Sequence, residues 1–209
     1  LKNGEGDVSN LGSHEYMNWA DSNNYQVWAL FSNDFDPEIT AEALASFETR
    51  KKIIRQLLYY SHLYNLDGIN IDFENVYLKE RDLVTQFVRE LTPYLHEAGL
   101  VVSMDVTFIS TSENWSMFYD RAALASIVNY MMVMAYDEHW ATSPQSGSVA
   151  SLPWVERNLV KILEEIPAEK LILGVPFYAR LWTEQDTEGG NVEVSSKALS
   201  MVAVQQWIT

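Results

Sequence analysis

The chain of 209 residues contains no cysteine, and this absence removes several kinds of chemistry. Without cysteine there is no disulfide, no thiolate nucleophile and no cysteine-ligated metal site, although the compartment stays open. Basic residues are also few: 14 lysines and arginines stand against 29 aspartates and glutamates, which gives a formal charge of −15. Because such a chain repels phosphate backbones and anionic membranes, we expect no nucleic acid and no membrane among its partners.

Several sequence patterns are missing as well. No apolar run reaches the roughly 18 residues of a membrane span, and the opening LKNGEGDVSN lacks the charged and apolar regions of a signal peptide. The G-x-G-x-x-G, P-loop and G-x-S-x-G patterns are absent, which argues against a nucleotide site and a serine hydrolase. The four histidines show no H-E-x-x-H spacing, so we predict no metal site and no cofactor.

The residues that are present predict one α/β domain, because 47% of them are hydrophobic and apolar runs alternate with helical spacing. Strands are predicted at residues 26–32, 66–74, 100–108, 129–136 and 170–177. Helices are predicted at residues 48–64, 80–98, 118–126, 153–165 and 195–208. A strand followed by a helix, repeated along the chain, indicates parallel strands with right-handed crossovers.

Two architectures fit this alternation, an open doubly wound sheet and a closed (β/α)8 TIM barrel. Polar side chains follow successive predicted strands, as in a barrel, whose active site gathers at the carboxyl ends of its strands. No glycine-rich first turn supports the doubly wound alternative. A barrel needs eight strands and about 250 residues, whereas five strands are predicted here. We therefore predict a truncated barrel that holds about strands 3 to 7.

The segment LDGINIDFENV, residues 66–76, places polar side chains along one face of a predicted strand. Alternation puts Asn70, Asp72 and Glu74 on one side, since successive strand residues point to opposite faces. Neighbouring members of this column stand about 6.6 Å apart along the strand, close enough for each acid to raise the proton affinity of the other. A buried hydrogen-bond network is the alternative interpretation of the column.

Further candidates follow the later strands. Substrate contacts are predicted for Asp105, Asp137, Tyr178 and Arg180, although Arg180 could equally be an ion-pair partner for Asp137 or Asp105. The ring of Trp140 could stack on a flat face of the substrate. A metal-dependent enzyme with Asp72, Glu74 and Asp105 as oxygen ligands also stays open, since hard cations take carboxylates.

Three motifs, in order, resemble glycoside hydrolase family 18. The stretch D-G-I-N-I-D-F-E at residues 67–74 resembles the D-G-x-D-x-D-x-E signature of family strand 4. MAYDEHW at residues 134–140 resembles the M-x-Y-D segment of strand 6, and GVPFYARLW at residues 174–182 resembles the G-x-P-x-Y-x-R segment of strand 7. The combination of NIDFEN and AYDEHW is similar to the bacterial branch of spore-cortex-lytic and surface-layer-associated N-acetylglucosaminidases.

The resemblance implies a retaining mechanism in which the 2-acetamido oxygen of the substrate is the nucleophile. Glu74 would be the general acid and then the base, Asp72 would orient the acetamido N–H, and Tyr136 would donate a hydrogen bond to the acetamido oxygen. The expected substrate is a polysaccharide containing β-1,4-linked N-acetylglucosamine, with peptidoglycan or spore cortex favoured over chitin. The implied location is extracellular, in the cell wall or at the spore.

The sequence departs from the family pattern at two places. The first is Asn70, where the family carries a third aspartate; an amide can hydrogen-bond but cannot take a proton, so we expect activity with an altered pH profile. The second is FSNDF at residues 31–35, where many members carry a serine–glycine–glycine motif. Because the acid is retained at Glu74, a catalytically silent, lectin-like barrel is the alternative and not the first interpretation.

The resemblance covers essentially the whole chain. We interpret residues 1–209 as a partial family 18 catalytic domain, and residues 183–209 as an insertion or the start of the segment after strand 7. Exposed edges of a parallel sheet invite partners, so completion of the barrel by a second copy, as an oligomer, remains open.

Overall fold

The computed structural model describes residues 1–187 and 189–208. Five parallel strands form one sheet in the order β1-β2-β3-β4-β5. These strands are β1 (Trp28–Ser32), β2 (Gly68–Asp72), β3 (Val101–Thr107), β4 (Tyr130–Met134) and β5 (Leu171–Gly174). Each lies inside a predicted strand, so the predicted α/β class with a parallel sheet is confirmed.

Seven helices accompany the sheet in the described part of the chain. They are α1 (His14–Ser22), α2 (Pro37–Ala45), α3 (Phe47–Tyr64), α4 (Arg81–Glu97), α5 (Arg121–Ile127), α6 (Leu152–Ile162) and α7 (Met201–Ile208). Short helical turns occur at Leu78–Glu80, Glu113–Met117 and Ala168–Lys170. Within residues 1–187 and 189–208 no helix is both long enough and apolar enough to cross a membrane.

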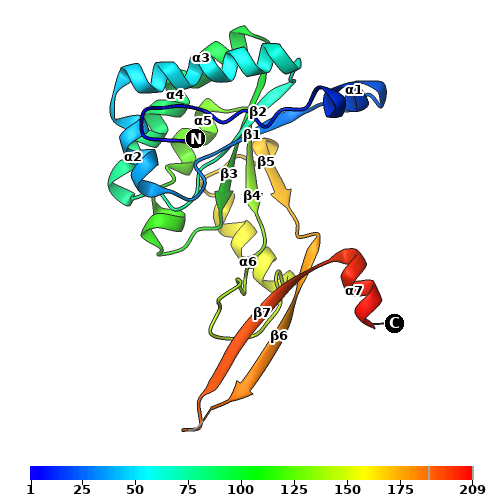
Figure 1. Cartoon of the computed structure of the whole chain (residues 1–209). Coiled ribbons are helices and arrows are strands. Elements are labelled where there is room, and N and C mark those ends of the chain that lie inside the picture. Colours follow the sequence, from blue (N-terminus) through cyan, green and yellow to red (C-terminus); the bar gives the residue numbers. More distant parts are fainter. Residues whose placement is uncertain (188, 209) are drawn as a thin grey trace.

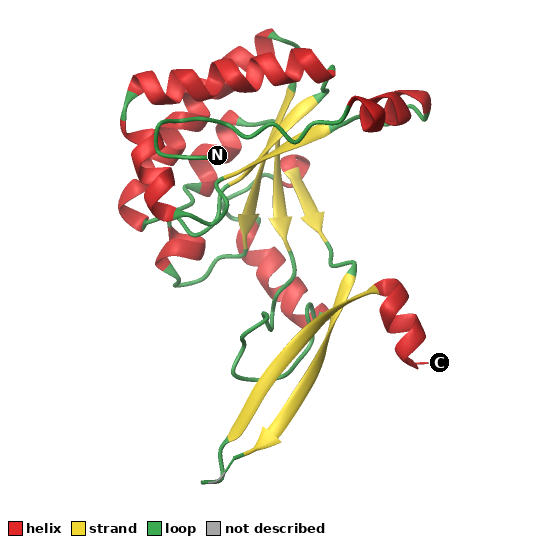
Figure 2. Ribbon diagram, in the orientation of Figure 1, coloured by secondary structure: helices red, strands yellow, loops and turns green. Residues whose placement is uncertain are grey.

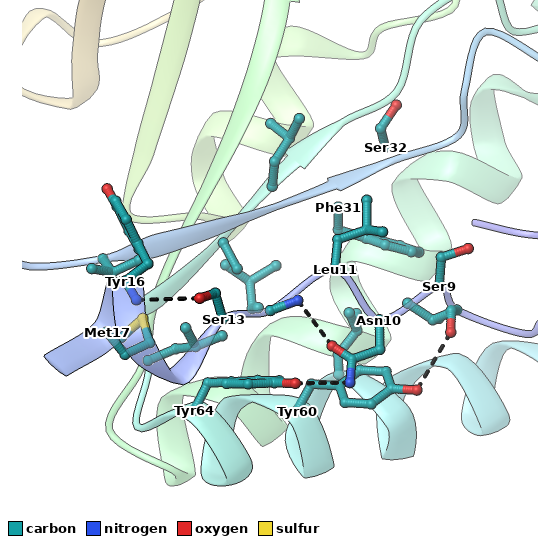
Figure 3. A pocket seen from close by; sticks show the side chains of 18 of the residues that line it. Ser9, Asn10, Leu11, Ser13, Tyr16, Met17, Phe31, Ser32, Tyr60 and Tyr64 are labelled. Carbon is teal, nitrogen blue, oxygen red and sulfur yellow. Dashed lines mark hydrogen bonds between the residues drawn. The ribbon is translucent and has the colours of Figure 1, made fainter. Parts of the chain in front are cut away.

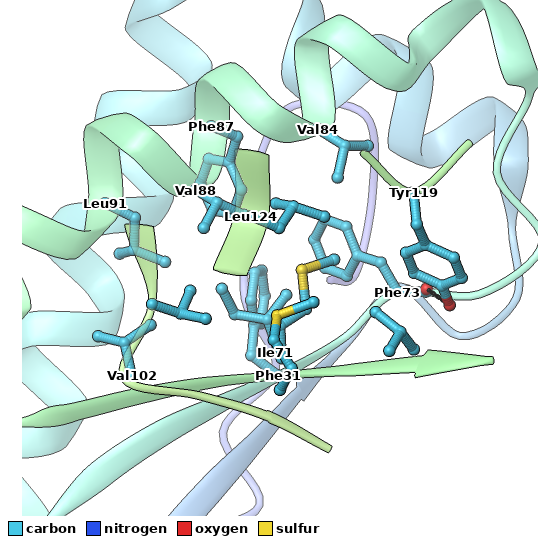
Figure 4. Close-up of a cluster of buried hydrophobic side chains, with 14 of the residues drawn as sticks. Phe31, Ile71, Phe73, Val84, Phe87, Val88, Leu91, Val102, Tyr119 and Leu124 are labelled. Carbon is cyan, nitrogen blue, oxygen red and sulfur yellow. Dashed lines mark hydrogen bonds between the residues drawn. The ribbon is translucent and has the colours of Figure 1, made fainter. Parts of the chain in front are cut away.

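The hydrophobic core lies on one face of the sheet, and Figures 1 and 2 show helices α2 to α5 gathered over that face. Alternation along the strands explains this arrangement, because Ile69, Ile71 and Val102 point into the core and are at most 2% exposed. Figure 4 shows Ile71 and Val102 in one cluster with Phe87 and Leu91 of α4. The other face carries the polar column and has no layer of helices over it (Figure 1).

The sheet is open in the described residues, with β1 and β5 as its edges (Figure 1). Closing a (β/α)8 barrel takes eight strands, and this sheet has five. The strands lie in the sheet in the same order as in the chain, which is also the order in a (β/α)8 barrel. The described residues nevertheless do not form a closed barrel.

Two short helices were not predicted from the sequence. Both α1 and α2 have nine residues and begin at side chains that cap their first turn, Ser13 and Asp36. The Asp36 carboxylate accepts hydrogen bonds from the backbone N–H groups of Glu38 and Ile39, and Pro37 occupies the first turn. Capping and proline therefore define α2 more strongly than its weak apolar periodicity does.

The C-terminal part of the chain corrects two predictions. The predicted strand 170–177 ends at Gly174, and a separate antiparallel hairpin follows, made of β6 (Tyr178–Asp186) and β7 (Val192–Ser200). Pro176 lacks a backbone N–H and lies in the break between β5 and β6.

The predicted helix 195–208 was wrong over its first six residues, because residues 195–200 pair with β6 and only Met201–Ile208 is helical. Of residues 183–209, predicted as an insertion or the start of the segment after strand 7, residues 183–186 belong to β6, Val192–Ser200 form β7 and Met201–Ile208 form α7, while residues 188 and 209 lie outside the described residues. Figure 1 shows this hairpin projecting beyond the carboxyl ends of the sheet strands.

Candidate functional site

The polar column lies on the face of β2 that points away from the core. Ile69, Ile71 and Phe73 are buried against the helices, so Asn70 and Asp72 face the opposite way. Glu74 follows the last strand residue by two positions. The structure therefore has the predicted alternation, and the column lies where β2 ends.

Asn70 joins two neighbouring strands through its amide. Its Nδ2 donates to Asp105 Oδ2 of β3 at 2.8 Å, and its Oδ1 accepts from the Ser103 hydroxyl at 2.6 Å. Asn70 is 8% exposed and Ser103 is fully buried. Both polar ends of this amide are thus satisfied within the protein.

The two acids of the column are difficult to ionise. Burial raises the pKa of Asp72 above its ordinary value. Burial, followed by the charges of Asp72, Asp105 and Asp137, raises the pKa of Glu74 to about 7. Asp72 Oδ1 is buried and accepts no hydrogen bond from the described residues. Glu74 can therefore hold its proton near neutral pH beside a carboxylate oxygen that lacks a donor.

Asp105 belongs to the same electrostatic cluster. Burial raises its pKa to about 6, the Asn70 hydrogen bond opposes that rise, and the Asp72 charge adds to it. We predicted Asp105 as a sugar contact; the structure places one of its oxygens on the Asn70 amide.

Tyr136 follows β4 at the same end of the sheet. Burial, then the charges of Asp105, Glu74 and Asp72, raises its pKa to about 12, so the phenol stays protonated and can donate a hydrogen bond. Its ring meets that of Tyr178 edge to face, with the two centroids 6.2 Å apart. The structure thus brings Tyr136 together with the acids of β2 and β3.

Asp137 is held by two side chains of the hairpin. Its Oδ1 accepts from the Tyr178 hydroxyl at 2.6 Å and from an Arg180 guanidinium N–H at 2.9 Å. Of the two interpretations of Arg180, the structure contains the ion pair with Asp137. Burial, then the hydrogen bond to Asp137, raises the pKa of Tyr178. Because Tyr178 and Arg180 belong to β6, this group couples the hairpin to the sheet.

Trp140 lies on the loop between β4 and α6, and its side chain is 51% exposed. The hairpin holds this loop through two bonds to backbone carbonyls: Trp182 Nε1 donates to Gly147 at 2.8 Å, and the Ser196 hydroxyl donates to Ala141 at 2.8 Å. An exposed indole on a fixed loop suits stacking on a flat ligand face.

Sequence reasoning missed the side chains that fix the backbone at Glu74. Asn33 is 1% exposed, and its Oδ1 accepts a hydrogen bond from Glu74 N–H at 3.0 Å. Its Nδ2 donates to Glu74 C=O at 2.8 Å and to the Thr40 hydroxyl at 2.9 Å. The buried Tyr119 hydroxyl donates to Phe73 C=O at 2.7 Å. Residue 33 lies in the FSNDF segment, so the departure from the family motif was visible but its role was not.

A pair of exposed aromatic rings also escaped prediction. Phe35 and Trp115 lie 6.0 Å apart between centroids, and both are at least 43% exposed. Asn75, the residue after Glu74, donates to Phe35 C=O at 2.8 Å, which ties this pair to the same loop.

A cavity of about 580 Å³ lies away from this site (Figure 3). It is enclosed by the N-terminal segment, α1, α3 and β1, and its lining includes Leu11, Phe31 and Tyr60. Ile69, which lines it too, points away from the polar column. Among the described residues, no three histidine, aspartate or glutamate side chains are grouped so that they could hold a metal ion.

Known proteins resemble this chain in sequence and in fold. The family described as Glycosyl hydrolases family 18 matches residues 3–207. YdhD of Bacillus subtilis, named as a sporulation-specific glycosylase, is 34% identical over 155 residues, which are 73% of this chain and 36% of YdhD. Its crystal structure superposes with a TM-score of 0.85 at 27% identity, covering 98% of this chain and 70% of that one.

Two further proteins show the range of these relatives. The cortical fragment-lytic enzyme of Bacillus subtilis is 25% identical over 164 residues, 77% of this chain and 38% of the enzyme. A chitinase structure from Chromobacterium violaceum has a TM-score of 0.83 at 22% identity, covering 99% of this chain and 65% of that one, and so shows the shared fold. The chain spans between 36% and 58% of the length of the Bacillus subtilis relatives that it matches.

Proposed function

The chain belongs to glycosyl hydrolases family 18, and we propose that it hydrolyses β-1,4 bonds in a glycan that contains N-acetylglucosamine. Peptidoglycan or spore cortex is the favoured substrate, with chitin second, since the relatives include proteins named for sporulation and for lysis of cortical fragments. An enzyme of this kind would work outside the cell, in the wall or at the spore.

The observation that carries the proposal is the state of Glu74. A general acid must be protonated at the working pH, and the pKa of Glu74 is raised to about 7 by burial and by the neighbouring acids. Asp72 is beside it, with one oxygen to which no side chain or backbone group of the described residues donates. Protonated Glu74 can give its proton to a glycosidic oxygen. The Asp72 oxygen can at the same time accept a hydrogen bond from a substrate N–H.

The first step of the proposed reaction breaks the glycosidic bond. Glu74 gives its proton to the glycosidic oxygen, and the bond between that oxygen and the anomeric carbon breaks as the 2-acetamido oxygen of the same sugar attacks that carbon. Asp72 accepts a hydrogen bond from the acetamido N–H and stabilises the oxazolinium cation that forms. Tyr136, whose phenol stays protonated, donates to the acetamido oxygen.

The second step restores the enzyme. Glu74, now a carboxylate, takes a proton from water, and the water oxygen attacks the anomeric carbon while the bond to the acetamido oxygen breaks. Since each attack inverts the carbon, the product keeps the β configuration. No cofactor is needed in this sequence.

Sugar contacts are proposed for the residues around this centre. The cluster of Asp137, Tyr178 and Arg180 offers a carboxylate, a hydroxyl and a guanidinium in fixed positions. Trp140 offers an exposed ring on the loop that the hairpin fixes. Asp105 keeps one carboxylate oxygen free of the Asn70 bond and could accept from a sugar hydroxyl.

The test is hydrolysis of N-acetylglucosamine oligosaccharides and purified peptidoglycan by the 209-residue chain. We expect β-anomer products from the wild type, none from Glu74→Gln, and normal yields from Glu97→Gln, a matched change at an exposed position of α4. Sugar binding without products from the wild type would overturn the proposal in favour of a lectin. Loss of activity with a chelator would overturn it in favour of a metal-dependent enzyme.

For the architecture, we propose that the sheet supplies about strands 3 to 7 of a (β/α)8 barrel, with residues 1–209 as a partial catalytic domain. Support comes from the sheet face that no helices cover and from the short span of the chain along its relatives. The edges β1 and β5 could then pair with a second copy. Light scattering after size exclusion tests this pairing: a dimer is expected, and a monomer at tens of micromolar would refute completion in trans.

A further inference from the structure

The acids at the polar face do not all come from one strand. The column of β2 contributes Asp72 and Glu74, while its third polar position is the amide Asn70. The third carboxylate of the cluster is Asp105, which reaches the same place from β3. The charge of this site therefore comes from β2 and β3, with Asp137 after β4 as a further contributor.

The amide of Asn70 fixes where the Asp105 carboxylate lies. An ionised carboxylate only accepts hydrogen bonds, so the amide nitrogen must face Asp105 and the amide oxygen must face the Ser103 hydroxyl. All three groups are buried or half-buried, and the two bonds are 2.8 and 2.6 Å long. Asp105 is thus oriented by the protein and does not depend on a ligand for its position.

We propose that Asp105 is a positioning residue for Glu74: its carboxylate, held by the Asn70 amide, supplies from β3 a negative charge that keeps the proton on Glu74. This proposal rests on the proposed function, because it concerns the acid of that reaction. The pKa of Glu74 is consistent with it, since burial is followed by the charges of Asp72 and Asp105 among the causes of its rise.

Other charged or titratable groups face this cluster from each neighbouring element. They are Asp72 of β2, Tyr136 and Asp137 after β4, Tyr119 and Arg121 near the start of α5, and Tyr178 and Arg180 of β6. Arg180 pairs with Asp137 and not with Asp105. Asp105 therefore keeps its charge available to Glu74.

The test compares Asp105→Asn with the reciprocal exchange Asn70→Asp plus Asp105→Asn. The exchange moves the carboxylate from β3 to β2 and keeps an amide–carboxylate pair between the strands. One readout is the pH dependence of kcat/KM on N-acetylglucosamine oligosaccharides. The second is a carbon-13 NMR titration of the Glu74 carboxyl, identified by its loss in Glu74→Gln, which needs no catalysis.

We expect Asp105→Asn to lower both the pKa of the basic side of the pH profile and the Glu74 titration midpoint by about half to one pH unit, the order of the effect of removing one neighbouring charge in a partly buried site. The exchange should return both toward their wild-type positions. Asp21→Asn, which removes the same charge from the exposed surface of α1, should move neither.

Three outcomes separate the hypotheses. Unchanged Glu74 titration in Asp105→Asn would overturn the positioning role. If Asp105→Asn raises KM and leaves the basic side of the pH profile of kcat/KM in place, Asp105 is a sugar contact instead. If the wild type hydrolyses nothing, the proposed function fails, while the NMR titration still decides whether Asp105 controls the proton of Glu74.

Discussion

Removal of the Asn33 side chain should destabilise the protein, because this residue holds the backbone of the proposed catalytic acid. In Asn33→Ala the Glu74 N–H and C=O both lose their partner, and the Thr40 hydroxyl loses a donor. A buried polar group left unpaired costs about 1–3 kcal/mol. Two such groups in a half-buried loop give an expected loss of about 2–4 kcal/mol.

Urea denaturation followed by circular dichroism measures this loss as a fall in the free energy of unfolding. Two variants control the comparison. Thr40→Val removes the acceptor of Asn33 and the hydroxyl bond to Asp36 C=O, which keeps its bond from Thr40 N–H, but it leaves the Glu74 bonds, so it should cost only about 1 kcal/mol. Asn18→Ala makes the same chemical change at an exposed position of α1 and should stay within about 0.5 kcal/mol of the wild type.

A free energy for Asn33→Ala equal to that of Asn18→Ala would refute the reasoning, since it would mean that water satisfies the Glu74 backbone as well as Asn33 does. If Asn33→Ala does not fold at all, the smaller loss expected in Thr40→Val still tests the network. A loss in Thr40→Val as large as in Asn33→Ala would show that the Thr40 bond, and not the pair with Glu74, is what matters.

Two further changes probe charged groups. The pKa of Glu74 in the folded protein is about 7, above its ordinary 4.5, so ionisation of Glu74 opposes folding as the pH rises between these values. In urea titrations Glu74→Gln should therefore be more stable than the wild type at pH 8 and equal to it at pH 4. No gain in stability at pH 8 would contradict this. Arg50→Met removes two guanidinium bonds to Glu90, which keeps only its bond from Gln86, and one bond to Leu44 C=O, so it should cost about 1–3 kcal/mol near pH 7. Because Arg50 lowers the pKa of Glu90, that cost should shrink as pH falls below 4.5, and thermal melts at pH 7 and 3.5 would show it.

Much of the sheet could be predicted because its strands are buried on one face. A run such as VVSMDVTF alternates buried Val102, Met104 and Val106 with polar residues, and that pattern has a period of two residues in the sequence itself. The hairpin β6–β7 was harder, because most of its side chains are exposed and few apolar positions mark its period. Its stability comes from pairing between two segments, which no local pattern records.

The proposed site divides in the same way. The acids of β2 were visible because carboxylates at alternate positions of an apolar strand are costly unless they are used. The network around them was not visible: Asn33 is 41 residues before Glu74 in the chain, and Tyr119 is 46 residues after Phe73. Contacts at such separations depend on how strands and loops assemble, so a single sequence gives the acid but not its supports.

The two faces of the sheet have different physical tasks, and this division explains how the acids are tolerated. One face buries Ile69, Ile71 and Phe73 against α4 and its neighbours, and this burial provides the stability of the domain. The opposite face can then hold Asp72 and Glu74 in surroundings that disfavour their charge, at a cost that the core offsets. If so, a core change such as Ile71→Ala should lower stability and leave the Glu74 titration midpoint in place, whereas Asp105→Asn should move the midpoint with little loss of stability.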